Sequence, residues 1–171
     1  MDTTSAQDHE GQELGLQFRA AMRKLASTVT VITAVDADEH HGMAATAVTS
    51  LSMDPPSLLV CVNRTATMHG ALHLAQLFCI NLLGVQHGPL CDAFGGKLTG
   101  AARFGMGEWI SGEDGVRYLV DAPANIFCRL EEQHGYGTHT IFIGRVERVR
   151  VIENGQPLLY QAGTIGGFLP I

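Results

Sequence analysis

A polar cluster follows the apolar run 58–62 and consists of Asn63, Arg64, Thr65 and Thr67. Apolar residues at helical spacing begin directly after it, so the cluster lies at the N-terminus of a predicted helix. Free backbone N–H groups and the positive end of the helix dipole attract anions at such a place. Because Arg64 adds a full charge, the sequence predicts an anion site, with Thr65 or Thr67 as the helix N-cap.

Small and hydroxyl-bearing side chains fill the stretch before this run, where a core strand would carry bulk: Thr46, Ala47, Val48, Thr49 and Ser50. Asp54-Pro55-Pro56 forces a turn between the two segments, so both features fall at the same end of neighbouring strands. Small side chains allow a flat group to lie close to the backbone. A planar ring joined to a phosphate fits both features, whereas a tight barrel strand and an ordinary helix cap are the simpler interpretations.

Histidines offer two further candidate sites. His139 ends the segment 134–139, which we expect to be a loop, and the residues leave open whether it is a core histidine or a donor to a cofactor. His69 and His73 lie four residues apart on the predicted helix, as metal ligands do, but no HExxH pattern or third ligand accompanies them. A surface or packing role is favoured for this pair. The sequence contains no GxSxG elbow, so a hydrolase is the least supported class.

Strands outnumber helices among the elements that must position these residues. Strands are predicted at 28–35, from Gly42, at 58–62, 78–83, 124–132, 138–152 and 158–161, and helices at 18–25, 67–77 and 86–94. Residues 36–41 form a predicted turn, and the resulting meander needs no crossover helices, which indicates antiparallel pairing. Closure removes exposed sheet edges, so we expect a mainly β (α+β) protein built as a closed or nearly closed barrel with peripheral helices.

Composition limits the class of protein. The chain has 171 residues, of which 46% are hydrophobic and 16% charged, which indicates one globular domain. Its net charge of -6, with scattered basic residues, argues against nucleic acid or membrane surfaces as partners. No secretory signal is visible, and four cysteines without CxxC spacing indicate free thiols in the cytoplasm. Residues 1–15 are expected to be a flexible tail and 16–171 the domain.

Several stretches, in this order, together resemble the flavin reductase-like family: FRAAMRKLASTVTVIT, GMAATAVTSLSMDPPSLLVCVNR, FCINLL, CDAFGGK, ARF and GTHTIFIGRVERV. The similarity is greatest to the small reductase components of two-component flavin-dependent monooxygenases, such as the 4-hydroxyphenylacetate type. The resemblance implies an antiparallel split β-barrel of the FMN-binding type and a homodimer. It also implies that NADH or NADPH reduces FMN or FAD, which then serves a separate oxygenase in the cytoplasm.

The resemblance also implies roles for particular residues. Thr46–Ser50 would line the flavin ring, 63–67 would hold the ribityl phosphate, and His139 would be the catalytic residue beside the nicotinamide. Phe94, Arg103 and Phe104 would flank the ring or the tail. The flavin-binding residues implied in this way are Thr46, Ala47, Val48, Thr49, Ser50, Cys61, Val62, Asn63, Arg64, Thr65, Thr67, Phe94, Arg103 and Phe104, with no metal ligand.

The resemblance ends at the C-terminus, where Tyr160 is followed by Gln161 rather than by a basic pair. Basic groups bind the phosphates of pyridine nucleotides, so the choice between NADH and NADPH stays open. Two alternatives remain beside the reductase: a flavin carrier or electron-transfer flavoprotein on the same fold, and a metal-dependent protein that uses His69 and His73.

Overall fold

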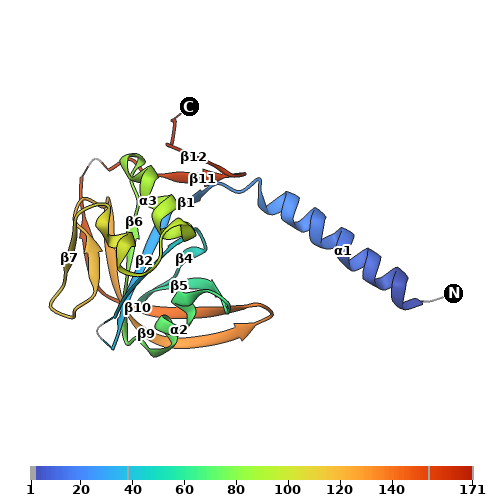
Figure 1. Ribbon diagram of the computed structural model, residues 1–171, viewed down its shortest axis with the longest axis horizontal. Helices are drawn as coiled ribbons and strands as arrows, with labels where there is room; N and C mark the ends of the chain where they lie inside the picture. Colours follow the sequence, from blue (N-terminus) through green and yellow to red (C-terminus); the bar gives the residue numbers. More distant parts are fainter. Residues whose placement is uncertain (1–2, 38, 154, 171) are drawn as a thin grey trace.

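A seven-stranded antiparallel sheet organises the chain in the computed structural model, which describes residues 3–37, 39–153 and 155–170. Figure 1 shows the sheet wrapped into one body, with a long helix standing away from it. The elements are α1 (Thr3–Met22), β1 (Ser27–Thr28), β2 (Thr30–Asp36), β3 (Glu39–Ala45), β4 (Val48–Met53), β5 (Pro56–Asn63), α2 (Thr67–Leu74), β6 (Leu77–Leu82), η1 (Val85–His87), α3 (Gly88–Asp92), η2 (Ala93–Lys97), η3 (Gly100–Gly105), β7 (Trp109–Ser111), β8 (Arg117–Leu119), β9 (Ala124–Tyr136), β10 (His139–Val151), β11 (Leu159–Gln161) and β12 (Thr164–Gly166).

The order of strands in the main sheet explains why it curls. The order is β3-β2-β6-β9-β10-β5-β4, so its two edge strands are consecutive in the chain and are joined only by Thr46 and Ala47. A connection this short requires the two edges to approach each other, which bends the sheet into a barrel. The edges β3 and β4 pair with β2 and β5 rather than with one another, so the barrel stays split. The expected antiparallel barrel is confirmed.

The segment from Gly42 differs from its prediction as a single strand. It forms β3 and β4, which pair with different neighbours at opposite edges of the sheet. The apolar core strands are confirmed: Val60, Ile80 and Phe142 are fully buried inside the barrel, as their unbroken apolar runs indicate. Asp54-Pro55-Pro56 forms the turn of the β4–β5 hairpin, also as expected.

Four other local predictions need correction. The turn expected at 36–41 is shorter, because β2 runs to Asp36 and β3 begins at Glu39. Segment 134–139 is no loop, because β9 runs to Tyr136 and β10 begins at His139, leaving only Gly137 and Thr138 as the turn. Helix α2 begins after Ala66, which is its N-cap, and neither threonine side chain caps it. Residues 3–15, expected as a tail, continue the helix predicted further on and form α1 with it, while the first two residues lie outside the described part.

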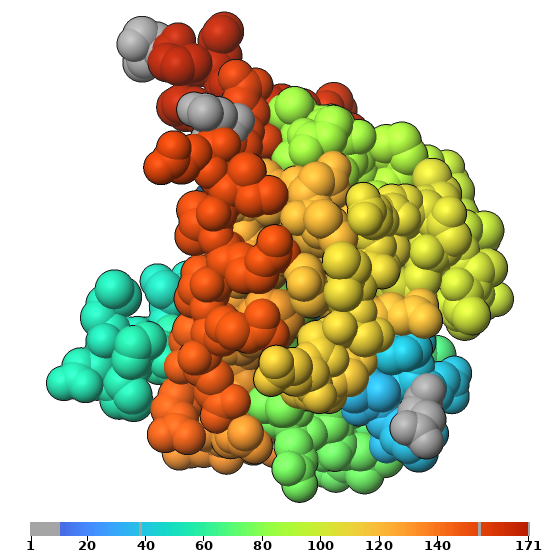
Figure 2. All heavy atoms as spheres, turned by 90° about the vertical axis from the view of Figure 1, so that its left-hand side faces the viewer, coloured from blue at the N-terminus to red at the C-terminus, as the bar shows by residue number. Residues whose placement is uncertain are grey.

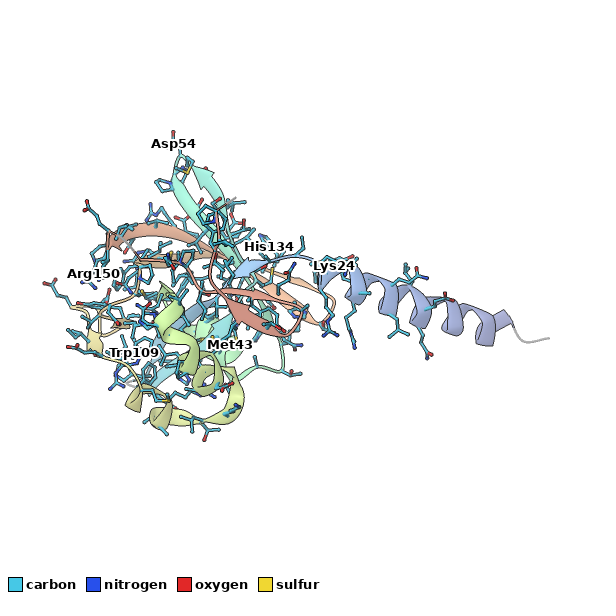
Figure 3. The ribbon with its side chains drawn as sticks, turned by 90° about the horizontal axis from the view of Figure 1, so that it is seen from above. Lys24, Met43, Asp54, Trp109, His134 and Arg150 are labelled. Carbon is cyan, nitrogen blue, oxygen red and sulfur yellow. The ribbon has the colours of Figure 1, made fainter. Side chains whose placement is uncertain are left out.

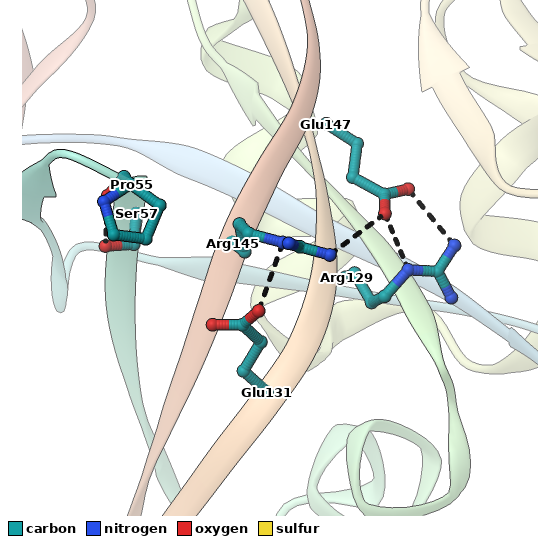
Figure 4. A network of polar contacts seen from close by, with 6 residues as sticks. All are labelled: Pro55, Ser57, Arg129, Glu131, Arg145 and Glu147. Atoms are coloured by element: carbon teal, nitrogen blue, oxygen red, sulfur yellow. Dashed lines mark hydrogen bonds and ion pairs between the residues drawn. The ribbon is translucent and has the colours of Figure 1, made fainter.

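An ion-pair ladder stiffens the β9–β10 hairpin on its solvent side. Arg129 Nε lies 2.6 Å from Glu147 Oε1, and Arg145 Nε lies 3.0 Å from Glu131 Oε1 (Figure 4). Exposed pairs contribute roughly 0–1 kcal/mol each, so the ladder fixes register more than it adds stability. The hairpin therefore presents its tip at a defined place. Across the described residues, no helix has the length and apolar character needed to cross a bilayer.

Candidate functional site

Three strand ends meet where the sequence places the anion site. The Cys61 N–H donates to the Ala47 carbonyl at 3.0 Å, which joins the start of β4 to the end of β5. The Arg64 N–H donates to the Thr138 carbonyl at 3.0 Å, and His139 lies opposite Asn63 in the β5–β10 register. The structure thus brings together the small-residue stretch, the turn 63–66 that carries Arg64 (the arginine turn) and His139. Thr46 and His139 are 93 positions apart in the sequence.

The turn after β5 holds its backbone through Asn63. The Asn63 Oδ1 accepts hydrogen bonds from the Thr65 backbone N–H and from the Thr65 hydroxyl, both at 2.9 Å. The start of α2, two residues after Arg64, has Ala66 as its N-cap and no side-chain cap, so no side chain caps the first N–H groups of the helix. An uncapped helix end next to an exposed guanidinium is a suitable site for a phosphate.

Glycine at position 135 makes room for the arginine. A Cβ atom built on Gly135 would collide with Nη2 of Arg64, so the guanidinium lies directly over the β9–β10 hairpin. Gly135 pairs with Thr140 in the register of that hairpin. The positive charge of Arg64 therefore lies close to the backbone of this hairpin.

His139 is exposed on the same tip. Its Nδ1 lies 2.8 Å from the Thr138 hydroxyl, an interaction between adjacent residues that orients the ring. With Nδ1 engaged, Nε2 is the nitrogen directed to other groups. The histidine is therefore no core residue, and the exposed position leaves it free to meet a ligand.

Two hollows flank Thr46, the corner hollow and the mouth hollow. The corner hollow has a volume of ≈ 520 Å³ and is lined by Val29, Ala44, Ala45, Thr46, Gly88, Cys91, Asp92, Tyr160, Gly163 and Ile165. The mouth hollow, of ≈ 570 Å³, opens at the barrel end near the β4–β5 hairpin, and Thr46, Val48, Thr49 and Ser50 are part of its lining. Both volumes fall in the range of small-molecule sites. The predicted wall is therefore divided: only Thr46 borders both hollows, and Ala47 borders neither.

Sequence reasoning missed the contribution of α3 and the C-terminal hairpin to the corner hollow. Gly88, Gly163 and Ile165 approach the small residues of β3 from regions far away in the chain. The tight turn between β11 and β12 uses positive φ at Ala162 (53°) and Gly163 (93°). The glycine-rich segment after Tyr160 was the available signal, but no local pattern connects it to β3.

Phe94, Arg103 and Phe104 lie behind β3 rather than on the surface of either hollow. The rings of Phe94 and Phe104 have centroids 5.3 Å apart and are both buried, and Gly42 leaves the space that Phe94 occupies. Arg103 Nη1 donates to the Gly42 carbonyl at 2.6 Å and Nε to the Leu98 carbonyl at 2.8 Å. In the described residues, these three side chains support the strand that forms the wall and do not line the hollow themselves.

The paired histidines of α2 do not share a ligand. The His69 and His73 rings stack with centroids 6.5 Å apart, but His69 Nε2 lies 2.9 Å from Thr140 Oγ1 and His73 Nδ1 2.8 Å from Gln133 Oε1. No group of three or more potential metal ligands occurs within the described ranges. Both rings thus dock α2 against the β9–β10 hairpin.

The four cysteines carry free thiols in two environments. Cys79 and Cys128 are buried, whereas Cys61 and Cys91 are partly accessible. Burial raises the pKa of the Cys128 thiol to about 12 and also raises the pKa of Cys79 well above its usual value. At pH 8 both therefore stay protonated and unreactive.

We expect iodoacetamide at pH 8 to leave Cys79 and Cys128 unmodified until denaturant is added. Peptide mass spectrometry before and after unfolding measures this, with the accessible Cys61 and Cys91 as internal references. Modification of Cys128 in the native protein at a rate equal to that of Cys61 would contradict the burial of this strand.

Comparisons with known proteins agree with this geometry. Residues 22–168 match the family model of the flavin reductase like domain. The chain is 47% identical over 150 residues to the reductase component of an FADH(2)-dependent resorcinol hydroxylase from Rhizobium sp. strain MTP-10005, covering 86% of this chain and 84% of that protein. It is 38% identical over 149 residues to the FMN reductase (NADH) RutF of Agrobacterium fabrum, covering 87% and 86%.

Solved structures agree as well. The NADH:FAD oxidoreductase SgcE6 of Streptomyces globisporus C-1027, in complex with NAD and FAD fragments, is similar with a TM-score of 0.84 at 28% sequence identity. That likeness covers 91% of this chain and 93% of the other. The flavin reductase PheA2 in its native state has a TM-score of 0.81 at 30% identity.

Proposed function

Because this chain belongs to the flavin reductase-like domain family, we propose that it is an NADH-dependent flavin reductase that supplies reduced FMN or FAD to a separate monooxygenase. The relatives' names support parts of this activity, since one is the reductase component of an FADH(2)-dependent hydroxylase and another is an FMN reductase (NADH). In this chain, the strand ends that meet at Arg64 are the observation that supports it. We assign the activity to residues 16–171, with α1 continuing toward the N-terminus.

We propose that the flavin spans from the corner hollow to the arginine turn. The ring would lie against Ala44, Ala45 and Thr46, where small side chains permit close approach to the backbone. The tail would cross Ala47, and its phosphate would meet Arg64 and the uncapped N-terminus of α2. The donor set fits this group, because both parts of the phosphate site are cationic or N–H donors and neither carries a carboxylate.

When bound, the flavin supplies the hydride-accepting chemistry, and the residues of the chain bind, orient and shield. Arg64 compensates charge at the tail, and the β3–β4 corner holds the ring plane. His139, with Nε2 directed outward, would donate a hydrogen bond to the nicotinamide and fix its position. No covalent step by the protein is required.

Replacing His139 by alanine is expected to lower kcat about tenfold, because an orienting hydrogen bond is lost while the hydride donor and acceptor remain. Stopped-flow absorbance of the reductive half-reaction, with NADH in excess, measures the change. The variant His139→Gln, which keeps a donor, should recover part of the rate. A loss beyond about 10⁴-fold would instead indicate an essential acid–base group.

One assay separates the reductase from the alternatives. Anaerobic NADH added to the flavin-loaded protein should bleach the oxidised-flavin absorbance, and turnover should be measured with FMN, FAD and riboflavin in turn. Protein that binds flavin but leaves it oxidised would be a carrier instead. We expect NADH to be used faster than NADPH, because residues 161–171 contain no lysine or arginine to bind an extra phosphate.

We further propose that the protein is a cytoplasmic homodimer. The four unpaired thiols suit a reducing compartment. Several large apolar side chains of α1 are exposed, including Leu14 and Phe18, which suits burial against another subunit. The oxygenase that receives the reduced flavin would be a separate protein, as the component name of the resorcinol hydroxylase relative says of that system.

A further inference from the structure

The long N-terminal helix has an apolar stripe that the described part of the chain leaves exposed. Leu14, Phe18 and Ala21 follow one another at spacings of four and three residues, Met22 extends the same face, and Leu25 continues the spacing just beyond the end of α1. This spacing is that of a helix seam that packs against another surface. Leu14 is 67% exposed and Phe18 65% exposed. The stripe defined by these five residues is therefore available for docking.

The helix also needs such a surface for its own stability. Gly11 and Gly15 interrupt it, and each glycine in a helix costs roughly 1 kcal/mol relative to alanine. In proteins, most of the stability of a helix comes from the packing of an amphipathic face rather than from intrinsic helix propensity. Figure 1 shows α1 pointing away from the body, so the packing surface is not supplied by the rest of the same chain.

The mouth hollow is a matching surface. Its lining contains no charged side chain among the described residues, and Leu58, Ile80, Leu82 and Ile126 form part of its floor. Met53, at 85% exposure, stands at its rim on the β4–β5 hairpin. Figures 2 and 3 show that this hairpin, with Asp54 at its tip, projects from the body. An uncharged hollow beside a projecting apolar residue suits an apolar helix face.

The hollow and the stripe of one chain are held apart. Ala26, Ser27 and Thr28 belong to the hollow's lining, so α1 leaves the body at its edge. The base of the helix is bound to the C-terminal hairpin, since Gln161 Nε2 donates to the Lys24 carbonyl at 2.8 Å and Arg23 Nη2 to the Ala162 carbonyl at 3.3 Å. These bonds direct α1 outward, away from the hollow beside it.

We propose that two copies of this chain exchange their α1 helices, each laying its apolar stripe into the mouth hollow of the other. Two identical chains provide two stripes and two hollows, which closes the assembly with two-fold symmetry. The whole of α1, about 30 Å long and about 10 Å wide, would bury roughly 1,200 Å² when laid on a surface in each direction, of which the apolar stripe supplies roughly 550 Å² and the polar N-terminal turns of the helix the rest. The exchange rests on the proposed homodimer and leaves the corner hollow open for flavin.

Four variants test the exchange, each measured by multi-angle light scattering after size exclusion, with circular dichroism to verify folding. Phe18→Glu puts a charge in the stripe and Met53→Glu puts one at the rim, and both are exposed positions. Leu16→Glu changes the opposite face of α1, and Ile110→Glu changes an exposed residue of β7, far from α1 in Figure 1. We expect the first two variants to be monomers, with dissociation constants raised at least about 100-fold, and both controls to remain dimers.

The possible results are distinct. A wild-type protein that is still monomeric at a concentration of about 10⁻⁴ M would overturn both the homodimer and the exchange. A dimeric Met53→Glu beside a monomeric Phe18→Glu would show that the stripes pair with each other, which overturns docking in the hollow. A dimeric Phe18→Glu, or dissociation of the controls, would overturn the exchange as well. NADH oxidation with FMN, measured on the same samples, reports on the reductase proposal separately.

Discussion

Replacing Arg64 by alanine is expected to raise the KM for FMN roughly 30-fold while leaving the KM for riboflavin unchanged. A hydrogen bond between a charged donor and a phosphate contributes about 2 kcal/mol, and riboflavin has no phosphate to lose. The side chain is exposed, and its backbone N–H keeps its bond to Thr138 in the variant, so the fold should be retained. The comparison of the two flavins isolates the tail from the ring.

Steady-state NADH oxidation with each flavin measures this difference, and a thermal melt of each variant verifies folding. Arg64→Lys, which keeps the charge but loses the two-pronged geometry, should fall between wild type and Arg64→Ala. The salt dependence of the KM for FMN should weaken in Arg64→Ala, because one charge pair is removed. An equal loss with FMN and riboflavin would place the phosphate elsewhere.

Local patterns were sufficient to predict most of the barrel. Val60 and Ile80 lie in unbroken apolar runs, and such runs are typical of strands buried on both faces. The Pro-Pro turn placed the strands on either side of it as neighbours, and that adjacency carried the prediction of a site at Arg64. The predicted anion site depends on residues close in sequence, from Asn63 to Thr67. There the structure has the expected turn before the helix, but the N-cap is Ala66 instead of a threonine.

Predictions failed where tertiary contacts decide the structure. The small residues from Gly42 to Ser50 have one uniform pattern, which gives no sign that one edge strand ends at Ala45 and the other begins at Val48. Phe94 carries no local sign that it fills the space left by Gly42 instead of facing a ligand. Residues 3–15 looked like a tail because they are mostly polar, with only Leu14 of the apolar stripe among them, yet they continue the helix that was predicted further along the chain.

The flavin ring was expected to lie on one wall of small residues, Thr46–Ser50, but this stretch borders two separate hollows. Thr46 lies between them, so the edge of the split barrel separates a small-residue corner from an apolar mouth. If a partner helix fills the mouth, the corner is what remains for a ring. The mutations that distinguish these hollows therefore test both proposals at once.

Replacing Thr46 by tryptophan is expected to lower kcat/KM by at least about 10³-fold for FMN, FAD and riboflavin alike. Thr46 borders both hollows, so an indole there, with its roughly 250 Å² of surface, would intrude on the corner where the ring is proposed to lie as well as on the mouth hollow, and every flavin carries that ring. Thr46 is exposed in the link between β3 and β4, so a larger side chain there leaves the core intact. Activity with riboflavin should be lost in Thr46→Trp but kept in Arg64→Ala. The two variants therefore distinguish a blocked site for the ring from a lost contact with the phosphate.

Quenching of flavin fluorescence on titration with protein measures the binding, and the thermal midpoint of each variant verifies folding. Thr46→Ser is the matched small variant and should bind flavin as the wild type does. Ser50→Trp fills the mouth hollow only, so it should spare flavin binding and weaken the dimer. If Ser50→Trp abolished binding while Thr46→Trp preserved it, the ring would lie in the mouth hollow, and the partner helix would have to dock elsewhere.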